Sequence, residues 1–203
     1  MVCIGVDLGQ KRDYSVIAVV TRPEVLTQTM GRQPWQVWVE RETGAAELRF
    51  LERLRLGTPY EEVVRRIVYI ARHEALGPGR RRLVVDATGV GNPVVERIRA
   101  ARPGCDFRPV TIVGGMGQRY SDGMYRVGKT DLISGLRAGM ESGDVAVAGR
   151  LRETPALVKE LAAFGNSTSG NSSGHDDMVI ALALAVWGVK ERVMGEMGNV
   201  RIV

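Results

Sequence analysis

The stretch that decides the fold is Val2-Cys3-Ile4-Gly5-Val6-Asp7-Leu8-Gly9, at the start of the chain. Residues 2–8 are mostly apolar and β-branched, and a glycine follows them, which is typical of a short buried strand. Asp7 interrupts this pattern, and a carboxylate within an apolar strand is costly unless it is paired or bound to a cation. The stretch therefore predicts a buried strand that also carries a chemically active residue.

Strand and helix patterns follow one another outward from this first strand. Tyr14–Val20 and Trp35–Glu40 have the patterns of two further strands, and three short strands in series favour an antiparallel meander. Later strands alternate with segments of helical hydrophobic spacing, and such crossovers make the strand pairs parallel. The later strands are expected at 82–85, 107–113 and 145–148, and the helices at 59–76, 94–101, 129–141, 151–164 and 176–193. We predict one α/β domain with a mixed five-stranded sheet, three strands antiparallel and then two parallel, flanked by helices.

Composition and charge are those of an ordinary globular chain. The 203 residues suit one domain, with 44% apolar and 25% charged residues. The net charge is +5 and is carried almost entirely by arginine, because lysine occurs only at positions 11, 129, 159 and 190. Arginine binds phosphate through two hydrogen bonds, so this surface is compatible with nucleic acid. A soluble surface encoded by a GC-rich genome explains the arginines equally well.

Cysteine use and hydropathy exclude several other classes of protein. Cys3 and Cys105 are the only cysteines; two cysteines allow one disulfide, but they make neither a disulfide framework nor a cysteine-based zinc site. No secretory segment stands at the N-terminus, and no run approaches the ~20 apolar residues of a membrane span. A soluble intracellular protein without a membrane partner is expected. Residues 165–174, rich in Gly, Ser and Asn, are expected to form a mobile loop.

Aspartates stand at the ends of three predicted elements. Asp7 lies near the end of the first strand, Asp86 directly follows Leu83–Val85, and Asp176 and Asp177 open the last helix. Each has an ordinary structural alternative, because Asp7 and Asp86 are good turn residues and Asp176 and Asp177 suit a helix N-terminus. All of them nevertheless occur where one fold brings side chains to the same edge of a sheet.

Converging carboxylates predict a metal site. They repel one another and favour a divalent cation, and hard oxygen ligands select Mg²⁺ or Mn²⁺. Two such ions about 3.5–4 Å apart can stabilise the attacking and the leaving oxygen of a phosphodiester displacement. We therefore expect Asp7, Asp86, Asp176 and Asp177 to hold two divalent ions and to catalyse phosphodiester hydrolysis.

These motifs resemble the nuclease domain of the large terminase subunit of tailed bacteriophages, a member of the ribonuclease-H-like superfamily. The resemblance covers nearly the whole chain. It rests on Gly5-Val6-Asp7-Leu8-Gly9 followed by Asp13, on Asp86-Ala87-Thr88-Gly89-Val90-Gly91, and on His175-Asp176-Asp177 before an apolar helix. The first string also occurs in actin-like proteins, whereas the second and third, in this order, are more specific.

The resemblance implies a ribonuclease-H-like fold and roles for individual residues. Asp7 and Asp86 would be metal ligands, with Asp176 or Asp177 completing the set. Asp13 would be an accessory carboxylate. His175 is a candidate general base, although its position also suits the start of a helix. The implied activity is metal-dependent cleavage of double-stranded DNA during viral genome packaging.

Four basic residues are candidate contacts to the DNA backbone: Lys129, Arg119, Arg126 and Arg137. A solvated helix face is the alternative for each of them. We find no base-reading motif and expect no sequence-specific cutting. Packaging-motor or portal proteins are expected partners, in the cytoplasm of an infected or prophage-carrying host.

The terminase resemblance also implies what the chain lacks. Full terminases carry an ATPase motor, and although Gly128, Lys129 and Thr130 occur in sequence, we expect neither a phosphate-binding loop nor a motor domain here.

Three other functions are compatible with the sequence. They are a RuvC-like Holliday-junction resolvase, a fragment of an actin-like sugar kinase or ATPase, and a non-catalytic DNA-binding or assembly module of the same fold.

Overall fold

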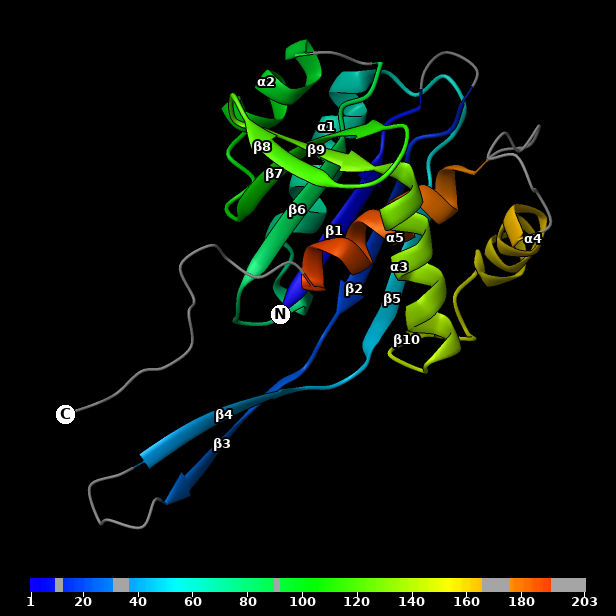
Figure 1. The fold of residues 1–203 in the computed structure, drawn as a ribbon. Coiled ribbons are helices and arrows are strands. Elements are labelled where there is room, and N and C mark those ends of the chain that lie inside the picture. The colour runs from blue at the N-terminus through cyan, green and yellow to red at the C-terminus, as the bar shows by residue number, and fades with distance from the viewer. Residues whose placement is uncertain (10–12, 31–36, 90–91, 166–175, 191–203) are drawn as a thin grey trace.

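The main sheet has the predicted first strand near its centre. The computed structural model describes residues 1–9, 13–30, 37–89, 92–165 and 176–190. Its eight-stranded sheet has the order β10-β5-β2-β1-β6-β7-β9-β8 (Figure 1). The bounds of its strands are β1 Val2–Asp7, β2 Val16–Thr21, β5 Ala46–Arg53, β6 Arg81–Asp86, β7 Asp106–Val113, β8 Gln118–Ser121, β9 Met124–Gly128 and β10 Val145–Val147.

The pairing of the five central strands confirms the predicted mixed sheet. β1 pairs antiparallel with β2, and β2 pairs antiparallel with β5. On its other side β1 pairs parallel with β6, and β6 pairs parallel with β7. Three outer strands enlarge the sheet beyond the predicted five. The strand expected at 145–148 is β10, which adds parallel to β5, and the unpredicted β8–β9 hairpin adds to β7 through β9. The α/β class is therefore right, and the strand count of five is too small.

The third strand of the meander is not the predicted one. Residues 37–43 form β4 (Val37–Thr43), which pairs only with β3 (Glu24–Met30) in a separate two-stranded ribbon that projects from the body (Figure 1). β5 takes the expected place beside β2. Its pattern is weak because Glu and Arg, which are poor strand formers, occupy half of its eight positions.

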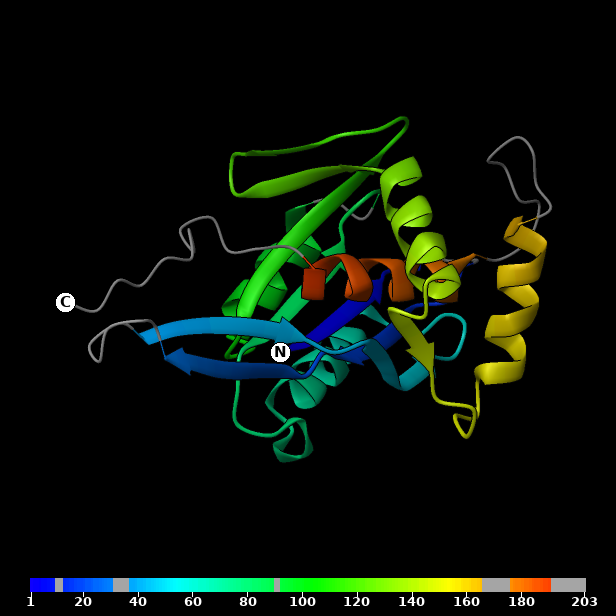
Figure 2. The same ribbon diagram turned by 60° about the horizontal axis from the view of Figure 1, so that its bottom comes forward.

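Helices cover both faces of the main sheet (Figures 1 and 2). One face packs against α1 (Tyr60–Arg72) and α2 (Asn92–Ala100), around Ile67 and Ile98. The other face packs against α3 (Lys129–Glu141) and α5 (Asp177–Lys190), with α4 (Thr154–Gly165) beside α5. A short 3₁₀ helix, Glu74–Leu76, follows α1. None of the helices within the described ranges is both long and apolar enough to cross a membrane.

α5 is buried on almost every side, although one apolar stripe was expected. Twelve of its fourteen residues are buried, which is typical of a helix inside a core. Gly5 of β1 permits the close approach, because a Cβ there would lie 2.1 Å from the carbonyl oxygen of Ala181. Gly188 likewise packs against Cys3. Cys3 and Cys105 are both free thiols, so the optional disulfide is not formed.

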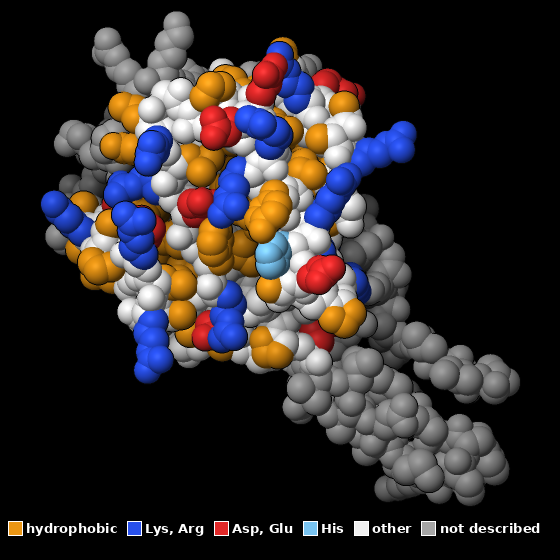
Figure 3. Space-filling view, turned by 180° about the vertical axis from the view of Figure 1, so that it is seen from behind, with side chains coloured by type: hydrophobic (Ala, Val, Ile, Leu, Met, Phe, Trp, Pro, Cys, Tyr) orange, Lys and Arg blue, Asp and Glu red, His pale blue; other side chains and the backbone are white. Residues whose placement is uncertain are grey.

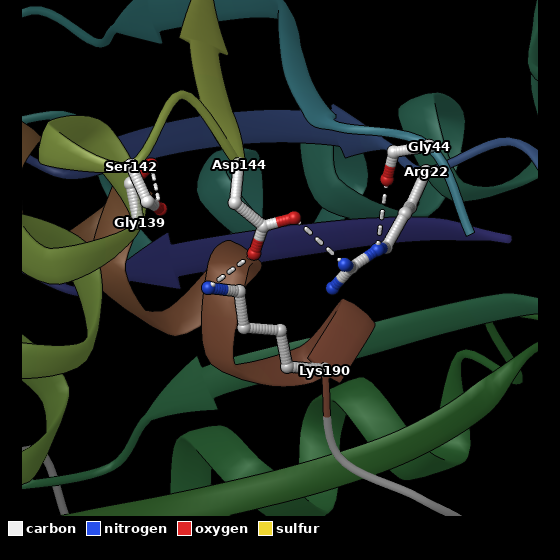
Figure 4. A network of polar contacts seen from close by, with 6 residues as sticks. All are labelled: Arg22, Gly44, Gly139, Ser142, Asp144 and Lys190. Atoms are coloured by element: carbon white, nitrogen blue, oxygen red, sulfur yellow. Dashed lines mark hydrogen bonds and ion pairs between the residues drawn. The ribbon is translucent and has the colours of Figure 1, made fainter. Parts of the chain in front are cut away.

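An ion-pair network fastens the base of the projecting ribbon to the body (Figure 4). Arg22, just after β2, donates one hydrogen bond to the Gly44 carbonyl oxygen and another, 2.8 Å long, to the Asp144 carboxylate. The other oxygen of Asp144 pairs with Lys190 Nζ at 2.8 Å. Asp144 therefore joins the ribbon base, the turn before β10 and the end of α5.

The segment 123–130 matches the sequence motif of a phosphate-binding loop but does not have the structure of one. It spells Gly-Met-Tyr-Arg-Val-Gly-Lys-Thr, which matches the Gly-x-x-x-x-Gly-Lys-Thr pattern. Asp122 (φ 54°) and Gly123 (φ 75°) make the tight turn of the β8–β9 hairpin, and the next five residues form β9. A phosphate-binding loop instead lies between a strand and a helix. Here the positions of that loop are occupied by the hairpin turn and β9, and Lys129 and Thr130 already belong to α3.

Candidate metal centre

Asp7 and Asp86 lie side by side at the same edge of the sheet. They end the neighbouring parallel strands β1 and β6, whose preceding residues Val6 and Val85 are directly paired. Adjacent strands are about 4.8 Å apart, and alternate residues share a face. Asp7 therefore shares a face with Gly5, and Asp86 with Val84, on the side of the sheet covered by α5. The predicted first pair of carboxylates is brought together.

The start of α5 lies beside the same edge. Asp176 occupies the N-cap position, since its carbonyl oxygen accepts the Ile180 N–H at 2.9 Å. Asp177 is buried, with 7% of its surface exposed, and its Oδ2 accepts the Tyr14 N–H at 3.4 Å. Because Tyr14 lies just before β2, this bond ties Asp177 to the chain that follows Asp7.

Asp7 lies within the electrostatic influence of four other carboxylates. Burial and the negative charges of Asp86, Asp177, Asp176 and Asp13, in that order of importance, raise the pKa of Asp7 well above its ordinary value. Within the described residues, no side chain or backbone N–H donates a hydrogen bond to the Asp7 carboxylate. A half-buried carboxylate that is repelled by its neighbours and receives no hydrogen bond from the described residues favours either a proton or a cation.

Asp86 is both a turn residue and a member of the cluster. Its Oδ1 accepts the Thr88 N–H at 2.8 Å, which is the turn-capping role considered as the alternative. Burial raises the pKa of Asp86, while hydrogen bonds from Thr88 and the positive charge of Lys129 oppose this rise. The local turn therefore fixes the direction of the Asp86 carboxylate.

Lys129 supplies a positive charge close to this cluster. Its Nζ forms an ion pair with Asp176 Oδ2 at 2.9 Å, and its charge also reaches Asp86. Among the residues that the structure describes, no three His, Cys, Asp or Glu side chains are grouped closely enough to hold one metal ion. The donor set, four carboxylates and no sulfur or imidazole, suits a hard cation such as Mg²⁺ or Mn²⁺. The chemistry fits such an ion, although the side chains are not grouped as its ligands.

Asp13 is the accessory residue whose place the structure describes. It is exposed and belongs to the electrostatic neighbourhood of Asp7. His175 and the predicted loop 165–174 lie outside the described residues, apart from Gly165, which ends α4.

The predicted DNA-binding residues occupy three different environments. Arg119 and Arg126 are exposed and directly opposite each other on the β8–β9 hairpin. Like charges in such a cross-strand pair repel each other. Arg137 is on α3 and pairs with Glu141, one helical turn away, at 2.8 Å. Lys129 is engaged by Asp176, so the hairpin arginines are the better placed of the four to meet an anion.

Glu160 is a further acidic residue of this region that was not predicted from the sequence. Its carboxylate, on α4, accepts the Met178 N–H of α5 at 3.1 Å, next to Asp177. Burial raises the pKa of Glu160, and the charge of Asp177 adds to that rise. The signal in the sequence is faint, because Glu160 follows Lys159 and precedes Leu161 in the helix expected at 151–164, as an ordinary surface residue would.

Comparisons with known proteins agree on one family. A family model described as the terminase RNaseH-like domain matches residues 78–187. The large terminase subunits of Thermus phage G20c and Thermus virus P23-45 are each 31% identical to the chain over 193 residues. These matches cover 90% of this chain and 30% of each relative, so the chain spans less than a third of their length.

Two solved structures have a distant similarity to the chain. The human cytomegalovirus terminase nuclease domain has a TM-score of 0.45 and 13% identity, covering 94% of this chain and 87% of that one. Thermus thermophilus RuvC has a TM-score of 0.44 and 15% identity, covering 97% and 98%. Both similarities are too distant to carry a conclusion about function.

Proposed function

Because the chain belongs to the terminase RNase-H-like domain family, we propose that it is a divalent-cation-dependent endonuclease that hydrolyses phosphodiester bonds of double-stranded DNA. Its role would be to cut the viral genome during packaging, as the nuclease part of a large terminase subunit. The observation that carries this proposal is the pair Asp7 and Asp86, side by side on one face of the sheet, with the start of α5 beside them.

The position of each acidic residue suggests which of the two cations it would hold. Asp7, on the rigid central strand, would help to hold both ions, while Asp86 would hold one of them. Asp177, buried and tied to Tyr14, and Asp176, at the surface, would hold the other. When bound, Mg²⁺ or Mn²⁺ would lower the pKa of a water nucleophile and neutralise charge on the phosphate. Asp13 would raise the local negative charge that attracts the cations.

The basic residues would hold the DNA backbone. Arg119 and Arg126 are directly opposite each other on β8 and β9, and a phosphate bound by both would relieve their mutual repulsion. Lys129 would join them once cations neutralise Asp176 and release its ammonium group. Arg137 would add a contact on α3. Backbone contacts of this kind carry no sequence information, so cleavage would not depend on one recognition sequence.

A packaging motor or portal protein would bring the DNA to this nuclease. It would feed the genome to the acidic edge of the sheet. The place of action would be the cytoplasm of an infected or prophage-carrying cell.

Plasmid nicking by Asp86→Ala tests the proposal. The variant should lose Mn²⁺-dependent nicking by about 100-fold or more, the scale expected when a group that stabilises transition-state charge is removed. Glu62→Gln, at an exposed position of α1, is the matched control and should nick at the wild-type rate. Unchanged nicking by Asp86→Ala would refute the assignment. Preference for a four-way junction over linear duplex would instead favour a resolvase.

A further inference from the structure

We propose that Glu160 is a positioning residue that holds the start of α5, and with it Asp177, against the acidic edge of the sheet. This inference rests on the proposed function, because it assigns Asp177 to the metal centre. Glu160 is on α4 and is remote in sequence from Asp7 and Asp86, so nothing in the acidic motifs points to it.

The contact that carries the inference is a helix cap supplied by another helix. The first backbone N–H groups of a helix have no partner inside it. In α5 the Met178 N–H is satisfied by Glu160 Oε2 at 3.1 Å. A carboxylate at this end also interacts favourably with the positive end of the helix dipole. Glu160 therefore fixes where α5 begins, one residue from Asp177.

Arg53 holds Glu160 from the side of the sheet. This arginine is the last residue of β5, and its Nη1 lies 3.8 Å from Glu160 Oε1. The same guanidinium group stacks over the Tyr14 ring, 4.9 Å from the ring centroid. Tyr14 in turn donates its backbone N–H to Asp177. Asp177 is thus held from two directions, through Tyr14 and through Glu160, and Arg53 contacts both of these supports.

The surroundings of Glu160 argue for positioning and against direct metal binding. One carboxylate oxygen accepts the helix N–H and the other faces Arg53. Its side chain is 12% exposed. Partners that orient metal ligands in this way typically contribute 10–100-fold to metal affinity or activity.

Calorimetric titration with Mn²⁺ tests the role without relying on activity. Glu160→Ala should bind Mn²⁺ roughly 10–100-fold more weakly than the wild type. Glu160→Gln should fall between them, because its amide oxygen still accepts the Met178 N–H but no longer attracts Arg53. The matched control is Glu153→Ala, since Glu153 also lies 3.8 Å from Arg53 but does not cap α5. This control should bind Mn²⁺ like the wild type.

Two further readouts separate positioning from general stability. Hydrogen exchange of the metal-free protein should be faster in the first turn of α5 for Glu160→Ala, and unchanged there for Glu153→Ala. In nicking assays at limiting Mn²⁺, Glu160→Ala should lower kcat and leave KM for DNA unchanged, because the basic DNA contacts are intact. If the alanine variant does not fold, Glu160→Gln carries both measurements.

The outcomes for Glu160 and for the nuclease are distinguishable. Wild-type Mn²⁺ affinity and wild-type exchange in both Glu160 variants would overturn the positioning role while leaving the nuclease proposal intact. A wild-type protein that neither binds Mn²⁺ nor nicks DNA would overturn the nuclease proposal, and the positioning role with it.

Discussion

At the scale of one residue, Asp7 is placed where its ionised carboxylate is unfavourable for folding. The chain places a carboxylate where burial and four other acidic groups disfavour its charge. The raised pKa means that the folded protein favours the protonated Asp7 carboxyl. The stability that this carboxyl contributes is therefore fully present below the ordinary pKa near 4, and it is lost as pH rises through the raised pKa. Ionisation of the Asp7 carboxyl in the metal-free protein is therefore unfavourable, and a bound cation would offset its cost.

Replacing Asp7 by Asn should stabilise the metal-free protein at pH 7. Relief of the buried, repelled charge is expected to contribute about 1–3 kcal/mol, and each kcal/mol raises Tm by roughly 2–4 °C for a chain of this size. Thermal melts should show no such gain near about pH 3.5, where the wild-type carboxyl is also neutral. The variant should also lose the rise in Tm that Mn²⁺ gives the wild type. A lower Tm at pH 7 would show that the Asp7 charge is already compensated.

Lys129 forms an ion pair with Asp176 and, in the proposed site, would compete with a cation for that carboxylate. Lys129→Ala should therefore bind Mn²⁺ at least as tightly as the wild type, while its affinity for DNA falls. Calorimetry with Mn²⁺ and a DNA-binding assay in the absence of metal separate the two effects. Weaker Mn²⁺ binding by this variant would mean that Lys129 helps to assemble the site and does not compete for it.

At the scale of elements, the sequence predicts those whose pattern is local. The helix expected at 129–141 has those bounds in the structure, and β1, β6 and β7 lie within one residue of their expected positions. β8 and β9 were missed because their four and five residues are too short for a periodic signal. The choice between β4 and β5 as the partner of β2 depends on tertiary pairing, which no local pattern records.

Asp144 connects three elements, and its removal should destabilise the protein. A hydrogen bond from Lys190 is the main cause of its lowered pKa. A lowered pKa gives stability above the unfolded value, near 4, that is lost as pH falls through the folded value. Asp144→Asn should therefore cost about 1 kcal/mol at pH 7 and less near about pH 3. Urea unfolding measures both values.

Glu141→Gln is the control for that measurement. It breaks the exposed pair with Arg137 on α3 and should destabilise the protein less than Asp144→Asn, because solvent screens an exposed pair. Equal effects of the two substitutions would mean that the network in Figure 4 adds nothing beyond a surface ion pair.

For the whole molecule, the predicted charges separate into two kinds of surface. The acidic groups lie at one edge of the sheet, and the exposed arginines of the β8–β9 hairpin lie at the sheet's end. The face of the molecule formed by α1, on the side of the sheet away from α5, mixes hydrophobic, basic and acidic side chains (Figure 3). A cavity of about 620 Å³ on this face is lined by Tyr69, Arg72 and His73 among others. DNA binding is therefore expected at the hairpin and the acidic edge.

Salt dependence of DNA binding tests that placement. Arg119→Ala and Arg126→Ala should each reduce the slope of log K against log salt concentration by about 1, since each would remove one phosphate contact. Arg137→Ala should reduce it less, because Glu141 already neutralises that arginine. The same slope for all three variants and the wild type would remove the hairpin from the proposed interface.

The candidate acidic residues stand out in the sequence more clearly than the residues that contact and hold them. Asp7 and Asp86 stand out because each contradicts or ends an apolar strand. No sequence motif marks the segments that contain Glu160, Arg53 and Tyr14. Only the packing of α4 and α5 against β5 brings these residues together. Supporting contacts between distant segments are set by tertiary structure, so a single sequence does not reveal them.

The most direct measurement is a crystal structure of the wild-type protein soaked in Mn²⁺, with the ions located by anomalous scattering. The expected result is Mn²⁺ density bounded by Asp7, Asp86 and the Asp176–Asp177 pair, with Lys129 displaced from Asp176. Ordered crystals in millimolar Mn²⁺ that show no ion between Asp7 and Asp86 would contradict a metal-dependent nuclease at this edge of the sheet.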